Sequence, residues 1–164
     1  MWEILGGLLV GSAISGVLPL VNAEVLVLVA AAAVPAVGVP LVAIVGTVGQ
    51  MSAKTSLFAL ARWAPHRLPQ RARGSLNRTS EALKSRGGAI SSLVFTSAVT
   101  GLPPFYGVSL ATGALGMRLS SFVASGGSGR LIRFGVLACA GRRFGEDALS
   151  FLGDTFNTIP GLGG

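Results

Sequence analysis

The sequence predicts an all-α, polytopic membrane protein with two re-entrant hairpins and transmembrane helices arranged as an inverted repeat. Only 12% of its 164 residues are charged, about half the share that is usual in a soluble domain. The ranges Val25–Ala53 and Gly87–Met117 carry no charge, and each exceeds the roughly 20 helical residues that cross a bilayer. Too little polar sequence remains to cover two such segments in water. A similar segment containing glycine and proline also lies in each half of the chain.

The first half of the chain, residues 1–66, is expected to form a hairpin followed by a spanning helix. The hairpin covers Ile4–Val34, and Pro19 breaks it because proline lacks an amide donor and clashes with the preceding turn. Backbone freed in this way is tolerated at membrane depth only inside protein or beside a wet cavity. The spanning helix covers Leu41–Ala61. We expect the first segment to be retained, because Met1-Trp2-Glu3 lacks the basic residues that begin a signal peptide.

A basic loop, residues 67–86, follows the first half. With Arg62 just before it, this part of the chain carries seven of the 13 basic residues (Arg62, Arg67, Arg71, Arg73, Arg78, Lys84 and Arg86). Basic residues beside apolar spans are typical of the cytoplasmic side, so we place residues 62–88 there. Aromatic residues are not interleaved with the basic ones in this segment, as they are where side chains stack on bases, and this argues against nucleic acid as a partner.

The second half, residues 87–145, is expected to repeat the first. Its hairpin covers Ala89–Met117 and breaks at Pro103 and Pro104, its spanning helix covers Leu119–Ala140, and a tail of residues 146–164 follows. The segment Ser12–Pro19 matches Ser97–Pro103 with one residue skipped. The first hairpin would then enter from outside and the second from the cytoplasm, which is the inverted-repeat plan of many transporters. The alternative is that both segments are kinked spanning helices.

Four ionisable residues fall within the apolar segments, and such residues are functional candidates because a charge at membrane depth is costly. They are Glu24, Lys54, Arg130 and Arg133. Small or polar residues recur every four positions before Lys54 and Arg133, so both cations should face protein or a cavity. The two arginines could instead extend to the interface. An ion pair with Lys54 or Arg133 would keep Glu24 charged, so this acid is either a proton-coupling group or part of a fixed structural pair.

Catalysis is not expected. The chain has one histidine, His66, and one cysteine, Cys139, which is too few for a disulfide framework and makes a metal site improbable. The glycines of Gly113–Gly116 and Gly126–Gly129 lie in apolar helical sequence, where they indicate close packing and not a phosphate loop. We therefore expect no enzyme activity, no cofactor and no metal.

The stretch Thr96–Met117, followed by Phe122 and Gly129-Arg130, resembles the second hairpin of the DedA/VTT superfamily, also called SNARE-associated Golgi proteins. Leu18–Leu26 resembles that family's first hairpin, whose proline precedes an acid, and Gly46–Arg62 resembles the helix that follows. The resemblance covers residues 5–140. It implies movement of phospholipids or polyprenyl phosphates between leaflets, in some bacteria dependent on the proton motive force.

By this resemblance, Glu24 matches the hairpin acid and Thr100–Tyr106 matches the second hairpin tip. The chain departs from the family pattern at two places. Thr100 and Phe105-Tyr106 stand where arginines flank the tip proline, and Lys54 stands near a position where an acid is common. These differences leave open which lipid or solute is moved.

We therefore expect a multi-pass protein of the cell membrane that passes a lipid headgroup along a polar path. Glu24 would be the titrating gate, while Lys54, Arg130 and Arg133 would attract phosphate beside Thr100. Membrane lipids are the expected partners, together with a second copy of the chain in a homodimer. The alternatives are a small-solute or drug exporter and a membrane organiser that transports nothing.

Overall fold

The computed structural model describes residues 1–17, 22–64, 70, 74 and 90–158, and it describes side chains as far as residue 147. Within these ranges the chain is entirely helical, which confirms the predicted all-α class. The elements are α1 (Trp2–Val17), α2 (Ala23–Ala33), the 3-10 turn η1 (Ala36–Gly38), α3 (Val39–Trp63), α5 (Ile90–Thr100), α6 (Phe105–Ala114) and α7 (Leu119–Thr158). Pro19 and nearly all of the basic loop lie outside the described residues.

The helix ends follow local sequence signals. The side chain of Asn22 caps α2 by accepting a hydrogen bond of 2.9 Å from the Glu24 amide. Pro40 lies in the first turn of α3, where its missing amide proton costs nothing. At the end of α6, Gly116 has φ +76°, and the Met117 amide donates to the Thr112 carbonyl in the manner of a Schellman motif. Residues 101–104 separate α5 from α6 and contain Pro103 and Pro104.

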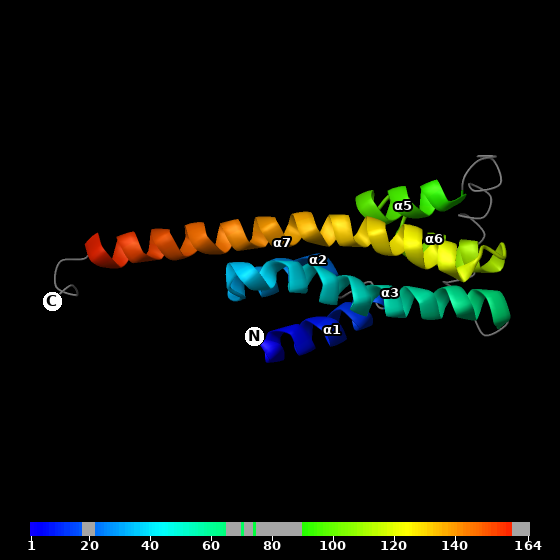
Figure 1. Ribbon diagram of the computed structural model, residues 1–164, viewed down its shortest axis with the longest axis horizontal. Helices are drawn as coiled ribbons and strands as arrows, with labels where there is room; N and C mark the ends of the chain where they lie inside the picture. The colour runs from blue at the N-terminus through cyan, green and yellow to red at the C-terminus, as the bar shows by residue number, and fades with distance from the viewer. Residues whose placement is uncertain (18–21, 65–69, 71–73, 75–89, 159–164) are drawn as a thin grey trace.

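The helices pack in a pattern that is the same in both halves of the chain. Helices α3 and α7 contact each other and run in opposite directions through the molecule (Figure 1). The first short helix of each half packs on the long helix of its own half, so α1 contacts α3 and α5 contacts α7. The second short helix packs on the long helix of the other half, so α2 contacts α7 and α6 contacts α3. The first pair of short helices therefore covers one half of the α3–α7 pair, and the second pair covers the other half (Figure 1).

Two apolar clusters correspond to these two halves. The first cluster joins α1 and α2 to the beginning of α3 and the later part of α7, with Val27 and Phe134 fully buried in it. The second joins α5 and α6 to the later part of α3 and the beginning of α7. Its centre is a stack of Phe58 on Phe122, whose ring centroids are 4.7 Å apart. The middle of the α3–α7 pair lies between the two clusters.

Glycines allow the helices to approach closely at these crossings. A Cβ at Gly49 of α3 would lie 2.5 Å from the Leu9 carbonyl oxygen of α1, and one at Gly129 of α7 would lie 2.8 Å from the Phe95 carbonyl oxygen of α5. Both distances are too short for a real side chain. Small residues at helix contacts are typical of membrane bundles, because close backbone approach replaces the hydrophobic driving force of water.

One helix in the described part of the chain, residues 36–63, is long and apolar enough to cross a membrane. It contains the predicted span Leu41–Ala61. The other predicted span, Leu119–Ala140, lies inside α7, which does not meet the same criteria, and its crossing stays a prediction.

Helix α7 differs from the expected tail, because it continues from Ala140 as far as Thr158. No proline interrupts 141–158, and Arg142 forms an ion pair of 2.7 Å with Glu146 one turn later. A Cβ at Gly141 would lie 2.5 Å from the Leu28 carbonyl oxygen, so α2 packs closely on this extension. Hydropathy alone predicts the apolar part of a helix and misses a polar continuation of this kind.

Gly129→Ala should destabilise the protein by about 1–3 kcal/mol, because its new methyl group would overlap the backbone of α5. The matched control is Gly127→Ala on the same helix, where no atom lies within 4 Å of the added Cβ. That control should be neutral or slightly stabilising, because alanine favours helix more than glycine does. Thermal unfolding of the purified protein in detergent measures both variants. Equal melting temperatures would contradict the close crossing of α5 and α7.

Candidate functional site

The four predicted ionisable residues lie on three helices near the ends of the short helices. Glu24 is in the first turn of α2, Lys54 is in the second half of α3, and Arg130 and Arg133 are one turn apart on α7. Their contacts reach the last turn of α1, the last turn of α5 and the first turn of α6. We call Glu24, Lys54, Arg130 and Arg133 the charged centre.

Arg133 joins the two halves of the chain through an ion pair with Glu24. Its Nε and Nη2 both donate to Oε1 of Glu24, at 2.9 and 2.5 Å. Its Nη1 donates at 2.6 Å to the carbonyl oxygen of Val99, the next-to-last residue of α5. The side chains of the pair are 22% and 33% exposed, so it is partly open to its surroundings. Sequence reasoning left the partner of Glu24 open between Lys54 and Arg133, and the structure places it on Arg133.

Lys54 of α3 makes the corresponding contacts with α1 and α6. Its Nζ donates at 2.7 Å to the carbonyl oxygen of Gly16, the next-to-last residue of α1. That carbonyl is free to accept because the last four carbonyls of a helix have no partner within the helix. The ammonium also lies 5.1 Å from the centroid of the Tyr106 ring at the start of α6. Lys54 is 5% exposed, so its charge is inside the protein.

Arg130 is the least satisfied member of the charged centre. It is 6% exposed, and no group among the described residues forms a hydrogen bond with its Nε. Its guanidinium lies 4.8 Å from the centroid of the Phe105 ring and 5.9 Å from that of Phe134. Cation–π contacts of this kind recover only part of the lost hydration. The alternative that Arg130 extends to an interface is wrong for the structure, because its side chain is enclosed by protein.

The charged centre has an excess of positive charge. It contains three cationic side chains and one carboxylate, and neither Lys54 nor Arg130 forms an ion pair in the part of the chain that the structure describes. A buried cation that has no counterion is strongly destabilising. An anion from outside the chain would remove this cost.

Thr100 has a structural role at the break between α5 and α6. Its hydroxyl donates to the Thr96 carbonyl at 2.8 Å and accepts from the Leu102 amide at 3.1 Å. Gly101 has φ +83°, a backbone conformation that favours glycine, and it lies against the Arg133 guanidinium. Thr100 therefore shapes the break that positions the Val99 carbonyl, and its own hydroxyl is already engaged.

Two buried polar groups on α1 and α3 were not predicted as site residues. The Oγ of Ser12 and the Oε1 of Gln50 are buried, and neither has a hydrogen-bond partner in the part of the chain that the structure describes. Gln50 lies one turn before Lys54, on the face whose four-residue spacing had been noted in the sequence. Ser12 begins the repeated segment. The repeat and the spacing were therefore signals for both residues.

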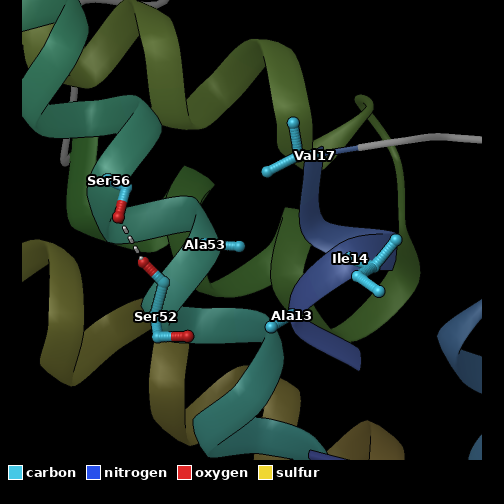
Figure 2. Close-up of a pocket in the computed structure, with 6 residues that line it drawn as sticks. All are labelled: Ala13, Ile14, Val17, Ser52, Ala53 and Ser56. Atoms are coloured by element: carbon cyan, nitrogen blue, oxygen red, sulfur yellow. Dashed lines mark hydrogen bonds between the residues drawn. The ribbon is translucent and has the colours of Figure 1, made fainter. Parts of the chain in front are cut away.

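An apolar groove of about 540 Å³ lies between α1 and α3 (Figure 2). Its lining residues are Ala13, Ile14, Val17, Ser52, Ala53 and Ser56. The two serine hydroxyls donate to backbone carbonyls of α3, at 2.7 Å from Ser52 and 3.0 Å from Ser56, so the lining offers few free polar groups. Gly16, whose carbonyl binds Lys54, lies between Ala13 and Val17 on the same helix.

Comparison with known protein families, curated proteins and solved structures gave no match. Among the residues that the structure describes, no group of three or more histidine, cysteine, aspartate or glutamate side chains could hold a metal ion.

A double-mutant cycle should detect the ion pair of the charged centre. Glu24→Gln and Arg133→Met should show a coupling energy of about 1.5–3 kcal/mol, the range of hydrogen bonds to charged groups. The control cycle uses Glu146→Gln and Arg142→Met, because Glu146 is 55% exposed and such a pair within one helix contributes about 0.5 kcal/mol or less. Melting temperatures in detergent give both cycles. Equal coupling in the two cycles would show that the Glu24–Arg133 contact is no stronger than a surface pair.

Proposed function

We propose that this protein is a multi-pass protein of the cell membrane that moves an anionic lipid, a phospholipid or lipid phosphate, between leaflets. The observation that carries the proposal is the pair of buried cations, Lys54 and Arg130, without a carboxylate partner among the described residues. A phosphate group supplies the missing negative charge and accepts several hydrogen bonds. Arginine and lysine are the usual protein partners of phosphate.

Exposed apolar side chains support a membrane location. Val10, Val25, Val29, Val48 and Val136 are each more than half exposed, on four different helices. Contact with lipid tails would cover these side chains at no cost. The apolar helix 36–63 and the close helix crossings at glycines favour the same environment.

The packing pattern supports an inverted repeat with re-entrant hairpins. Each pair of short helices is interrupted near the charged centre, and each contacts both long helices in the same way. In transporters of this kind, interrupted helices meet near the middle of the bilayer and form the substrate site there. The resemblance to the DedA/VTT superfamily supports the same architecture and extends it to lipid movement.

The groove between α1 and α3 gives the lipid a place for its tail. It is apolar, it opens on the surface of the helix bundle, and the end of α1 that lines it also holds Lys54. An amphipathic anion could place one acyl chain in the groove and its phosphate at the charged centre. A free solute would make no use of an apolar groove at this position, which favours a lipid over the small-solute alternative.

Glu24 is the proposed gate. While ionised, it holds Arg133 and closes the path between α2 and α7, and protonation would release the arginine. Movement of α2 away from α7 would then depend on a proton, which accounts for coupling to the proton motive force in the resemblance. A fixed structural pair would give no such dependence.

Lipid movement can be tested directly in proteoliposomes of phosphatidylcholine and phosphatidylglycerol. Fluorescent phosphatidylglycerol in the inner leaflet should become accessible to dithionite when the wild-type protein is present. Exchange by the wild type should be faster at lower pH, and Glu24→Gln should remove this pH dependence, because the neutral amide resembles the protonated acid and no longer holds Arg133 in an ion pair. Glu146→Gln, on the exposed part of α7, should leave it unchanged. Wild-type vesicles that match protein-free vesicles would refute lipid movement, whereas Glu24→Gln exchange that keeps the pH dependence of the wild type would refute the gate alone.

Filling the groove should slow lipid exchange without loss of the fold. Ile14→Trp places an indole in the space between α1 and α3, whereas Val10→Trp adds the same group on α1 outside the groove lining. The first variant should lower the exchange rate by about tenfold, the effect of losing roughly 1.4 kcal/mol of tail binding, and the second should not. The same dithionite assay measures both. Similar rates for the two variants would exclude the groove from the lipid path.

A further inference from the structure

The contacts of Lys54 and Arg133 correspond to each other. Each donates to the carbonyl of the next-to-last residue of a first short helix, Gly16 of α1 or Val99 of α5. Each also faces the second residue of a second short helix. Arg133 faces Glu24 of α2, and Lys54 faces Tyr106 of α6. The two cations therefore occupy equivalent positions in the two halves.

The halves differ in the group that meets the cation. Glu24 neutralises Arg133, whereas the Tyr106 ring attracts the ammonium of Lys54 and leaves its charge in place. An ammonium has three N–H donors, and the structure gives Lys54 one hydrogen bond, to Gly16, in the ranges that it describes. Of these two equivalent cations, Lys54 is therefore the one without a counterion among the described residues.

The start of α6 also has fewer groups that occupy its polar atoms than the start of α2 has. Asn22 caps α2 with its side chain, but Pro104 gives α6 no side-chain cap, so the first amides of α6 lack this partner. The positive end of the helix dipole is located there as well. Arg130 lies over the ring of Phe105, the first residue of α6, and its buried Nε has no hydrogen-bond partner within the described ranges.

We infer that the start of α6 is a phosphate-binding site held by Lys54 and Arg130, and that Tyr106 keeps it available by standing where the other half has an acid. A carboxylate at position 106 would form an ion pair with Lys54 and occupy the site from within. A phenol contacts the ammonium without competing for the anion. The inference rests on the proposed function only in identifying the phosphate as a lipid headgroup.

The test compares Tyr106→Glu with Tyr106→Phe in the purified, detergent-solubilised full chain. Dihexanoyl phosphatidic acid is the lipid probe, inorganic phosphate is the free-anion probe, and ligand-induced shifts of the melting temperature give apparent affinities. Wild type and Tyr106→Phe should bind alike, and Tyr106→Glu should bind about tenfold or more weakly, as expected when charged hydrogen bonds to the ligand are lost. Binding of the lipid probe alone assigns the site to a headgroup, and binding of both assigns it to phosphate in general. If neither probe binds the wild type, the inference is wrong.

Two further variants distinguish failure of the inferred phosphate site from misfolding and from failure of the proposed function. Lys54→Gln removes the cation without adding an acid and should also lose binding, so it decides the matter if Tyr106→Glu does not fold. Glu24→Gln removes the partner of Arg133 and leaves Lys54 and Tyr106 in place, so it should retain binding. Wild-type affinity in folded Tyr106→Glu or Lys54→Gln would overturn the site even if the wild type moves lipid. Conversely, phosphate binding in a protein that moves no lipid would refute the proposed function and leave the site standing.

Discussion

The interrupted helices depend on two cations that bind their exposed backbone ends. A helix that stops inside protein leaves its last carbonyl groups without partners, and a buried carbonyl costs free energy unless it accepts a hydrogen bond. Lys54 takes the Gly16 carbonyl of α1, and Arg133 takes the Val99 carbonyl of α5. Both cations project from the long helices α3 and α7, so each interruption is tied to the centre of the molecule. The charges that are costly in an apolar protein are therefore also the groups that stabilise its breaks.

Much of this arrangement could be predicted from residue types and spacing, because a charge within an apolar segment is costly and therefore indicates a functional or structural role. Glu24, Lys54, Arg130 and Arg133 were identified in this way, and the doubled proline at 103–104 indicated where a helix would be interrupted. The pairing of these groups was not predictable. Glu24 and Arg133 are 109 positions apart, and only the packing of α2 on α7 brings them together. Lys54 then has the Tyr106 ring and no carboxylate as its neighbour at the start of a short helix.

The aromatic residues that contact the charged centre were not predicted as cation partners, for a related reason. Phe105 and Tyr106 stand in apolar sequence, where an aromatic side chain normally indicates a packed core and carries no sign of a cation beside it. Their contacts with Arg130 and Lys54 follow from the position of α6 on α3, which the sequence pattern leaves undetermined. The signal that was present is the repeat itself, because both short second helices carry their distinctive residue at the second position.

A single acid among three cations is suited to the proposed role. If both halves carried an acid, Lys54 and Arg133 would be neutralised alike, and an incoming phosphate would have to break an ion pair to bind. If neither half did, the cost of three buried like charges would fall on the folded protein, and a phosphate would be held too tightly to leave. Transport requires binding strong enough for entry and weak enough for release. The Glu24–Arg133 pair neutralises one cation and stabilises the fold, while Lys54 and Arg130 remain able to bind an anion.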